Sequence, residues 1–321
     1  MSDLSIPAEP PSADDLLGQA DAVHDAEPAQ ALAMLRHLDA ASLSTARLPR
    51  LAFLLNHVLG EKFDLWPEAF AGQRAVIAAA GPATPAVLLR QAAVAAQIAG
   101  APAQAHAWVE ALAADAKAPV ATAQVLVNLA AAGFAAGRQD AETAGRLALR
   151  ALAPLAALHA LPRTSLDTAF AAVSNNIASD LLDRPLDDLA QPDLRTALAL
   201  CAEHSQRFWQ GAGTWVNVER AHYLRALAAN ALGDGVHAAA HARAGLDVLD
   251  TNDTAHAEDV DRAFIELELA HGLDVADMDG ADEARQRAET LASRFAQAWL
   301  TEWFASRVER NAALSAHYGR G

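Results

Sequence analysis

Two histidines spaced by four residues are the first side chains whose pattern could do chemistry. His237 and His241 would lie one turn apart on the same face of a helix, a common spacing of zinc ligands. His222 or Glu219, on the preceding helix, could provide a third ligand. Because no further ligand lies nearby in the sequence, we favour two solvent-facing histidines and predict neither a metal site nor a cofactor.

A cysteine and a histidine spaced by three residues are the second candidate pair. Cys201 is the only cysteine of the chain, and His204 follows it. A cysteine nucleophile needs a base and a group that orients the base, and the neighbouring sequence provides no such set. We therefore expect a buried thiol. A lone cysteine also excludes an intramolecular disulfide and is typical of the reducing cytoplasm.

Other sequence patterns of enzymes and calcium sites are incomplete or missing. Asp277, Asp279 and Gly280 resemble the middle of a calcium-binding loop, but Val275 and Gln286 stand where its first and last ligands belong. The sequence contains neither a Gly-Lys-Ser/Thr phosphate loop nor a Gly-x-Ser-x-Gly nucleophile motif. No acid–base pair can be assembled, so we expect a protein that is not an enzyme.

The net charge narrows the class of partner. The chain carries 40 acidic and 24 basic residues, a net charge of −16. This balance argues against binding to nucleic acid or to an anionic membrane surface, because both reward basic patches. The uncharged stretch from Ala118 to Gly137 is long enough for a membrane span, but its apolar character is mostly alanine. We interpret it as a helix buried between neighbours.

The composition predicts an all-α protein. Hydrophobic residues make up 53% of the chain and aromatic residues 5%, and the difference is largely alanine, the best helix former. Helical stretches separated by Gly, Pro or Asp form about seven pairs, which indicates an internal repeat. The predicted pairs are residues 13–24 with 28–40, 45–60 with 66–80, 85–99 with 103–116, 120–136 with 140–158, 164–182 with 186–209, 214–232 with 236–249, and 255–271 with 280–295.

These pairs define the predicted domains. Residues 1–12 are expected to be a disordered tail, residues 13–296 a helical repeat domain, and residues 297–321 a capping helix with a short tail. The turn at Gly233 is followed by Ala238 and Ala242 on one helix face, and similar layouts follow Gly100 and Gly137. Small residues on that face allow close helix contact, and each pair then needs the next to bury its surface.

The repeats resemble the tetratricopeptide repeat family. Asn128-Leu129-Ala130 and Asn176-Ile177-Ala178 are similar to the Asn-Leu-Gly/Ala signature in the first helix of such a repeat. The resemblance covers roughly Ala83 to Phe295 and implies a right-handed α-solenoid of about seven antiparallel helix pairs with a C-terminal capping helix. Another helical-hairpin solenoid with a different superhelical twist is the alternative fold.

In this family the first helix of each pair lines the concave surface, so the resemblance also implies a binding groove. Arg, Tyr and Asn side chains suit peptide recognition through carboxylate pairing, flat aromatic contact and amide hydrogen bonds. The residues expected on the concave face are Arg90, Asn128, Asn175, Arg220, Tyr223 and Asn230. The expected function is a non-catalytic scaffold that binds a protein or peptide partner in this groove. The alternative is a regulatory sensor that binds a small molecule or signalling peptide between repeats.

Aromatic residues cluster near the C-terminus. Phe295, Trp299 and Trp303 are spaced by four residues, and Phe304 lies beside them. We favour the packing of a terminal cap for this stripe. If the stripe is exposed, it is a surface for a partner or for a homo-oligomer.

Overall fold

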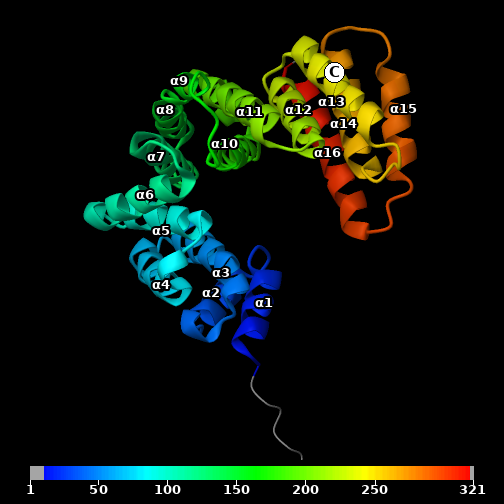
Figure 1. Ribbon diagram of the computed structural model, residues 1–321. Coiled ribbons are helices and arrows are strands. Elements are labelled where there is room, and N and C mark those ends of the chain that lie inside the picture. Colours follow the sequence, from blue (N-terminus) through cyan, green and yellow to red (C-terminus); the bar gives the residue numbers. More distant parts are fainter. Residues whose placement is uncertain (1–10, 319–321) are drawn as a thin grey trace, which may run out of the picture. The chain divides into compact units, whose positions relative to one another are not determined.

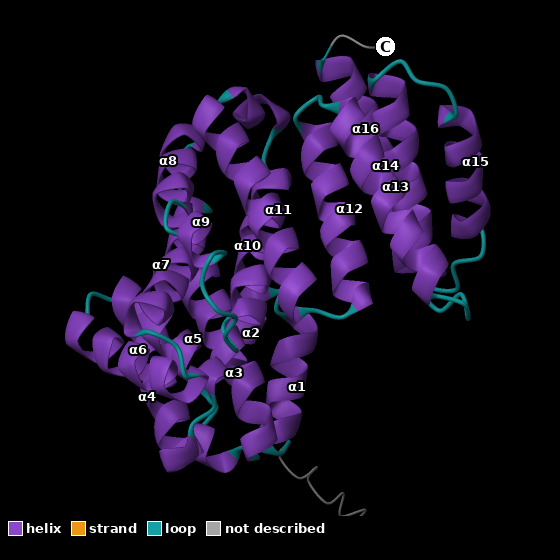
Figure 2. Ribbon diagram, turned by 45° about the horizontal axis from the view of Figure 1, so that its top comes forward, coloured by secondary structure: helices purple, strands orange, loops and turns teal. Residues whose placement is uncertain are grey.

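The computed structural model describes residues 11–318, and every regular element in this range is helical (Figures 1 and 2). The all-α prediction is therefore confirmed. The chain divides into two compact units, Met1–Ala131 and Ala132–Gly321. Most of the predicted disordered tail, residues 1–10, lies outside the described residues.

The first unit is built from helices that pack against their neighbours in the chain. α1 contacts α2, α4 contacts α5, and α5 contacts both α3 and α6. α3 continues without a break into a π-helical turn, η3, and α7 begins in this unit and ends in the second. The bounds are α1 Ala13–Val23, α2 Pro28–Arg36, α3 Leu48–Leu54, η3 Leu55–Lys62, α4 Trp66–Ala80, α5 Ala86–Ile98, α6 Pro102–Ala116 and α7 Val120–Ala136.

The second unit contains three consecutive helix pairs, α10 with α11, α12 with α13, and α14 with α15. The first helices of these pairs also contact one another in series, α10 with α12 and α12 with α14. The bounds are α8 Ala141–Leu152, α9 Leu155–Leu158, α10 Asp167–Leu182, α11 Pro192–Ala212, α12 Trp215–Ala231, α13 Gly235–Asn252, α14 Asp259–Val275, α15 Ala281–Ala292 and α16 Ala298–His317.

Prolines move several helix boundaries away from their predicted positions. The predicted helix 140–158 is two helices, α8 and α9, separated at Pro154. The predicted helix 186–209 is a short 3-10 turn followed by α11, which starts at Pro192. Proline lacks the backbone N–H that a helix interior needs, but it is well tolerated in the first turn.

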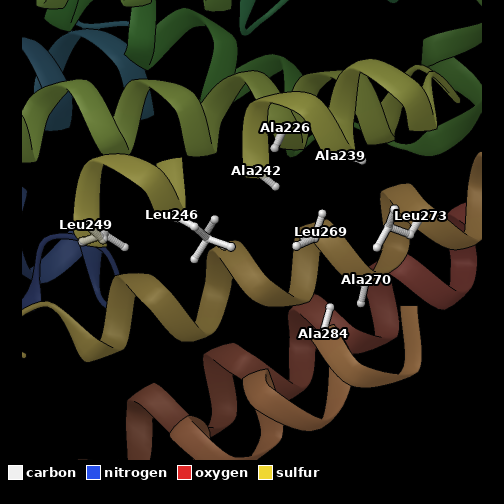
Figure 3. Packing of buried hydrophobic residues seen from close by; sticks show 10 residues of the cluster. Ala226, Ala239, Ala242, Leu246, Leu249, Leu269, Ala270, Leu273 and Ala284 are labelled. Carbon is white, nitrogen blue, oxygen red and sulfur yellow. The ribbon is translucent and has the colours of Figure 1, made fainter. Parts of the chain in front are cut away.

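Small residues hold the helix pairs of the second unit together. Ala226, Ala239, Ala242 and Ala270 belong to one buried cluster between α12, α13, α14 and α15 (Figure 3). The turn between α12 and α13 contains Gly233 at φ 75°, a conformation that glycine adopts at little cost. Ala238 and Ala242, the small residues expected on the inner helix face after this turn, both lack exposed surface.

Among the described residues, no single helix is long and apolar enough to cross a membrane, and only the bent pair α6 and α7, at 119°, meets the length and composition together. The segment interpreted as a buried helix lies mostly in α7, where Leu126, Val127 and Leu129 have no exposed surface.

Candidate functional site

α12 carries three of the six side chains expected to bind a partner, and Arg220 is the exposed one. A capping box between Thr214 and Asn217 fixes the start of this helix. The Arg220 Nε donates to Asp261 at 2.7 Å, and its Nη2 donates to Glu258 at 3.2 Å. Arg220 therefore already pairs with carboxylates at the start of α14.

Tyr223 is half-buried, and its hydroxyl has neither exposed surface nor a hydrogen-bond partner among the described residues. Burial raises the pKa of this hydroxyl. Its ring meets Phe264 of α14 edge to face, with the centroids 6.4 Å apart. Tyr223 thus packs between helices instead of offering its flat face to solvent.

Asn230 is fully buried, whereas the resemblance placed it on the open concave face. Its side-chain amide donates to the Glu268 carbonyl at 3.0 Å and to the Glu268 carboxylate at 2.7 Å. The residue therefore joins α12 to α14 and is not accessible in this structure.

The other three expected contact residues lie on α5, α7 and α10. Arg90 is half-buried, and burial lowers the pKa of its guanidinium. Asn128 is exposed and accepts a hydrogen bond from Gln124 at 2.9 Å, and Asn175 is half-buried. Arg90 and Asn128 belong to the first unit and Asn175 to the second, so the structure describes the six residues as two groups.

The last helix, α16, covers the face on which Tyr223 and Asn230 lie. It contacts α12 and α14, beside which it runs in Figure 1. Arg307 Nη2 donates to the Glu268 carboxylate at 2.9 Å, and Asn311 Nδ2 donates to the same oxygen at 3.3 Å. Glu268 has no exposed surface, so one buried carboxylate links α12, α14 and α16.

Contacts at the end of α16 extend this link to further helices. Arg310 Nη2 donates to the Leu182 carbonyl at the end of α10, at 3.0 Å. The Tyr318 hydroxyl donates to the Ala231 carbonyl at 2.7 Å and accepts from Arg195 of α11 at 3.2 Å. The helix therefore spans the ends of α10, α11 and α12 as well as α14.

The aromatic stripe, which runs from Phe295 before α16 into the first turns of that helix, is partly packed and partly exposed. Phe264 of α14 lies 4.3 Å from Trp303, 5.5 Å from Phe304 and 6.2 Å from Phe295, measured between ring centroids. Trp299 is nevertheless 61% exposed and Trp303 45% exposed, and their rings stack. Both interpretations of the stripe thus have a structural counterpart.

Sequence reasoning missed the polar centre of this arrangement. Glu268 stands within α14, most of whose residues are buried, and a carboxylate needs a partner there. Arg307 and Asn311 are spaced by four residues on a helix that is otherwise apolar on one face. A carboxylate on the apolar face of α14 and a guanidinium one turn before a buried asparagine on α16 are the signal that could have paired them.

No protein-family model matches this chain. Comparison with curated proteins and with solved structures gives no match either.

A second polar region lies between α11, α12 and α13, where a cavity of about 420 Å³ opens. Arg225 Nε donates to His241 Nε2 at 3.2 Å, and Arg225 Nη1 lies 3.8 Å from the Glu203 carboxylate. Burial, together with the Arg225 charge, lowers the pKa of His241 to about 4. The ring is therefore neutral at pH 7. The polar residues of this cavity are Arg195, Glu203, Arg225, Asp234, His237 and His241.

The two histidines spaced by four residues face different partners. His237 is exposed, as expected, and its Nδ1 lies 2.7 Å from Asp234. His241 is half-buried, against the expectation, and contacts Arg225 and His222. The Arg225 guanidinium disfavours a second cation at the His241 ring.

The thiol of Cys201 has no exposed surface, and burial raises its pKa, which confirms the expected buried cysteine. His204 pairs with His159 at 2.8 Å, and burial lowers the pKa of His204 to about 4. A buried thiol with a raised pKa is not an activated nucleophile.

Glu219 is a buried acid of the second unit. Its side chain has no exposed surface, and burial together with the neighbouring Asp261 raises its pKa to about 9. Its carboxyl group is therefore protonated at neutral pH. It lies 3.5 Å from the Nε of Arg220, at the junction of α12 and α14.

Proposed function

We propose that this protein is a non-catalytic scaffold whose second unit binds a helical segment of a protein partner on the face formed by α10, α12 and α14. The observation that supports this most directly is that the face already holds a helix, α16, through the buried carboxylate of Glu268. In this proposal α16 is the resident occupant of the groove, and a partner helix replaces it.

The contacts of α16 are those of a helix in a groove. Its buried residues are Leu300, Phe304, Asn311 and Leu314, whose spacing places them on one helix face. Apolar anchors on one face of a helix are the usual basis of such recognition. The pair between Arg307 and Glu268 favours one orientation, because a buried charge tolerates few alternative partners.

α16 does not fill the space beside α14 and α15 completely, so a partner helix could replace it. A cavity of about 440 Å³ remains between α14, α15 and α16, and Phe304, Val308 and Asn311 line its α16 side. Interfaces that contain such voids lack part of their packing contacts. A partner helix with larger side chains could fill this cavity and bind more tightly than α16.

The proposal also covers how the helix pairs are arranged along the chain. We propose that the pairs form a right-handed, tetratricopeptide-like α-solenoid of about seven helix pairs. The serial contacts of α10, α12 and α14 support this arrangement, since stacked hairpins place their first helices side by side.

The expected partner is a protein or peptide in the cytoplasm, and neither nucleic acid nor a membrane. The net charge of −16 supports the exclusion of both anionic surfaces. A homo-oligomer formed through the C-terminal helix is part of the proposal, because Trp299 and Trp303 expose a contiguous aromatic surface.

A direct experiment separates the groove from its occupant. A chain that ends after Phe295 is mixed with a fluorescently labelled peptide of residues 297–318, and binding is measured by anisotropy. We expect saturable binding that weakens at least about tenfold when the peptide carries Arg307→Ala, because the buried Glu268 then lacks its partner. Circular dichroism checks that the shortened chain is folded.

The matched control in the shortened chain is Glu283→Gln, an exposed carboxylate on α15 that does not line the cavity beside α16, against Glu268→Gln in the groove. Binding should weaken only in the Glu268 variant. A folded shortened chain that does not bind the peptide, or that binds the Arg307→Ala peptide equally well, contradicts the proposal.

The cavity between α11, α12 and α13 supports a second candidate function, a regulatory sensor. Its volume of about 420 Å³ falls in the range of small-molecule sites, and Arg195 and Arg225 make it suitable for an anion such as a carboxylate. Thermal shift assays with small mono- and dicarboxylates test this function. The shift should disappear in Arg225→Ala and persist in Arg243→Ala, an exposed arginine of α13.

A further inference from the structure

Three side chains of the first unit bring metal-ligand atoms together. His24 follows the last residue of α1, Asp25 is next in the chain, and His57 belongs to the π-helical turn η3. One nitrogen of each histidine and one carboxylate oxygen of Asp25 all lie within 4.8 Å of one another. Within residues 11–318, no other group of three or more such side chains converges in this way.

The distances suit coordination better than hydrogen bonding. His24 Nε2 lies 3.4 Å from one Asp25 oxygen, and His57 Nε2 lies 3.4 Å from the other. Two atoms that bind one zinc ion at about 2.0–2.1 Å in tetrahedral geometry are about 3.3 Å apart, which matches the separation of each Nε2 from one Asp25 oxygen. With one donor atom taken from each residue, all three lie within 4.8 Å of one another. Charge-assisted hydrogen bonds are shorter, about 2.7–2.9 Å, so the two contacts are loose as ion pairs.

The other nitrogen of each imidazole is held by an outer partner. His57 Nδ1 lies 2.6 Å from the carboxylate of Glu61, and His24 Nδ1 lies 2.5 Å from the backbone carbonyl of Asp21. Both contacts are satisfied when Nδ1 carries the proton, which leaves each Nε2 with a free lone pair facing Asp25. Carboxylates and carbonyls in this position are the usual outer partners of metal-binding histidines.

An aromatic wall fixes the rings from one side. Phe53 stacks on His57 with 5.3 Å between the centroids and meets His24 edge on at 6.3 Å. The guanidinium of Arg50 covers Phe53 at 4.5 Å from the ring centroid. The π-helical turn that carries both His57 and Glu61 is a rare element, frequently found at functional sites.

The three side chains of this group differ in how much of their surface is exposed to solvent. The side chains of His24 and His57 are 15% and 16% exposed, whereas that of Asp25 is 73% exposed. The imidazoles are thus fixed, and the carboxylate closes the group from the solvent side. A ligand set of this kind leaves at least one coordination position of a tetrahedral ion open to water or to another ligand.

We propose that His24, Asp25 and His57 form a binding site for a divalent transition-metal ion of the zinc class. The ion would join the end of α1 to η3, two segments separated by more than 30 residues, and would stabilise the first unit by binding only its folded form. The proposal is independent of the groove in the second unit.

The test is a calorimetric titration of the full chain with zinc ions alone, after treatment with a chelator. We expect one equivalent to bind and the melting temperature to rise. Asp25→Asn should weaken binding at least about tenfold, and Glu61→Gln by about 10- to 100-fold. Because Asp25 is 73% exposed, its substitution leaves the core of the unit intact.

His106→Gln is the matched control, since His106 is exposed and lies 3.4 Å from Glu110, also four residues away. Cobalt(II) provides a second readout, because its absorption bands report the ligands directly. Their loss in His57→Gln and persistence in His106→Gln would support the proposal. Absence of saturable zinc binding, or binding unchanged in Asp25→Asn and His57→Gln, would overturn it.

Discussion

The guanidinium of Arg307 lies 2.9 Å from the carboxylate of Glu268, and that carboxylate has no exposed surface. Asn230 and Asn311 donate to the same carboxylate from α12 and α16. Three helices therefore share one buried negative charge. The stability of their contact depends on all of its donors, because an unpaired buried charge is far more costly than the pair is favourable.

Removal of Arg307 should release α16. We expect Arg307→Ala to lower the free energy of unfolding by about 3–5 kcal/mol and to make the segment before α16 sensitive to protease. Denaturant unfolding and limited proteolysis measure the two effects. Adding Glu268→Gln should recover part of the loss, since the remaining side chain is neutral. A double variant less stable than Arg307→Ala would contradict this explanation.

The hydroxyl of Tyr223 contributes little to stability, because it is buried without a hydrogen-bond partner. Tyr223→Phe should leave the free energy of unfolding unchanged or raise it by up to about 1 kcal/mol. Tyr223→Ala removes the contact with Phe264 and should cost about 2–4 kcal/mol. Chemical denaturation of the two variants separates the hydroxyl from the ring. A clear loss of stability in Tyr223→Phe would show that the hydroxyl has a partner.

At Gly235 the backbones of α13 and α14 lie close together. A Cβ at Gly235 would lie 2.4 Å from the carbonyl oxygen of Gly272, which is backbone and cannot move aside. Gly235→Ala should therefore destabilise the second unit by about 1–3 kcal/mol. Gly137→Ala is the control, since the nearest atoms to its Cβ lie at 3.9 Å. Equal melting temperatures for the two variants would argue against the close contact.

The buried acid Glu219 should make stability depend on pH. Its pKa is raised from 4.5 to about 9, so between these values the folded chain holds a proton that the unfolded chain releases. This contribution to stability is complete below pH 4.5 and is lost as the pH rises through about 9. The loss is at most about 1.4 kcal/mol per pH unit.

Glu219→Gln should flatten this part of the profile, because the amide stays neutral at every pH. Glu289→Gln, an exposed acid of the same unit, should leave the profile unchanged. Thermal melts at pH 6, 7, 8 and 9 compare the three proteins. A wild-type profile that coincides with that of Glu219→Gln would show that Glu219 is ionised in the folded chain.

The all-α fold and several turns can be predicted from the local sequence. The residues that form the proposed binding face cannot. Alanine content and the glycine at 233 predict the pairs, because propensity and turn geometry act over a few residues. Asn230 looks like a surface residue in its own helix, and only Glu268, 38 positions later, explains its burial. The docking of α16 likewise depends on Arg307 meeting a residue of another helix pair.

The zinc-class group shows the same limit. His24 and His57 are 33 residues apart, and neither has a ligand spacing to the other in the sequence. Only the π-helical turn brings the second imidazole to Asp25. The spacing along one helix points to His237 and His241 instead, where the charge of Arg225 disfavours a bound cation.

Helix faces lined by alanine are nearly flat, because each side chain is a single methyl group. Two such helices can therefore shift by one turn against each other with little change in buried area. Between α12 and α14 a polar contact opposes such sliding, because the Asn230 amide donates hydrogen bonds to both the carbonyl and the carboxylate of Glu268. If apolar residues replaced Asn230 and Glu268, the two helices would still pack together, but no contact would fix a single register between them. We expect such a variant to keep its helix content but to show broadened side-chain NMR resonances, because helix pairs in several registers would interconvert.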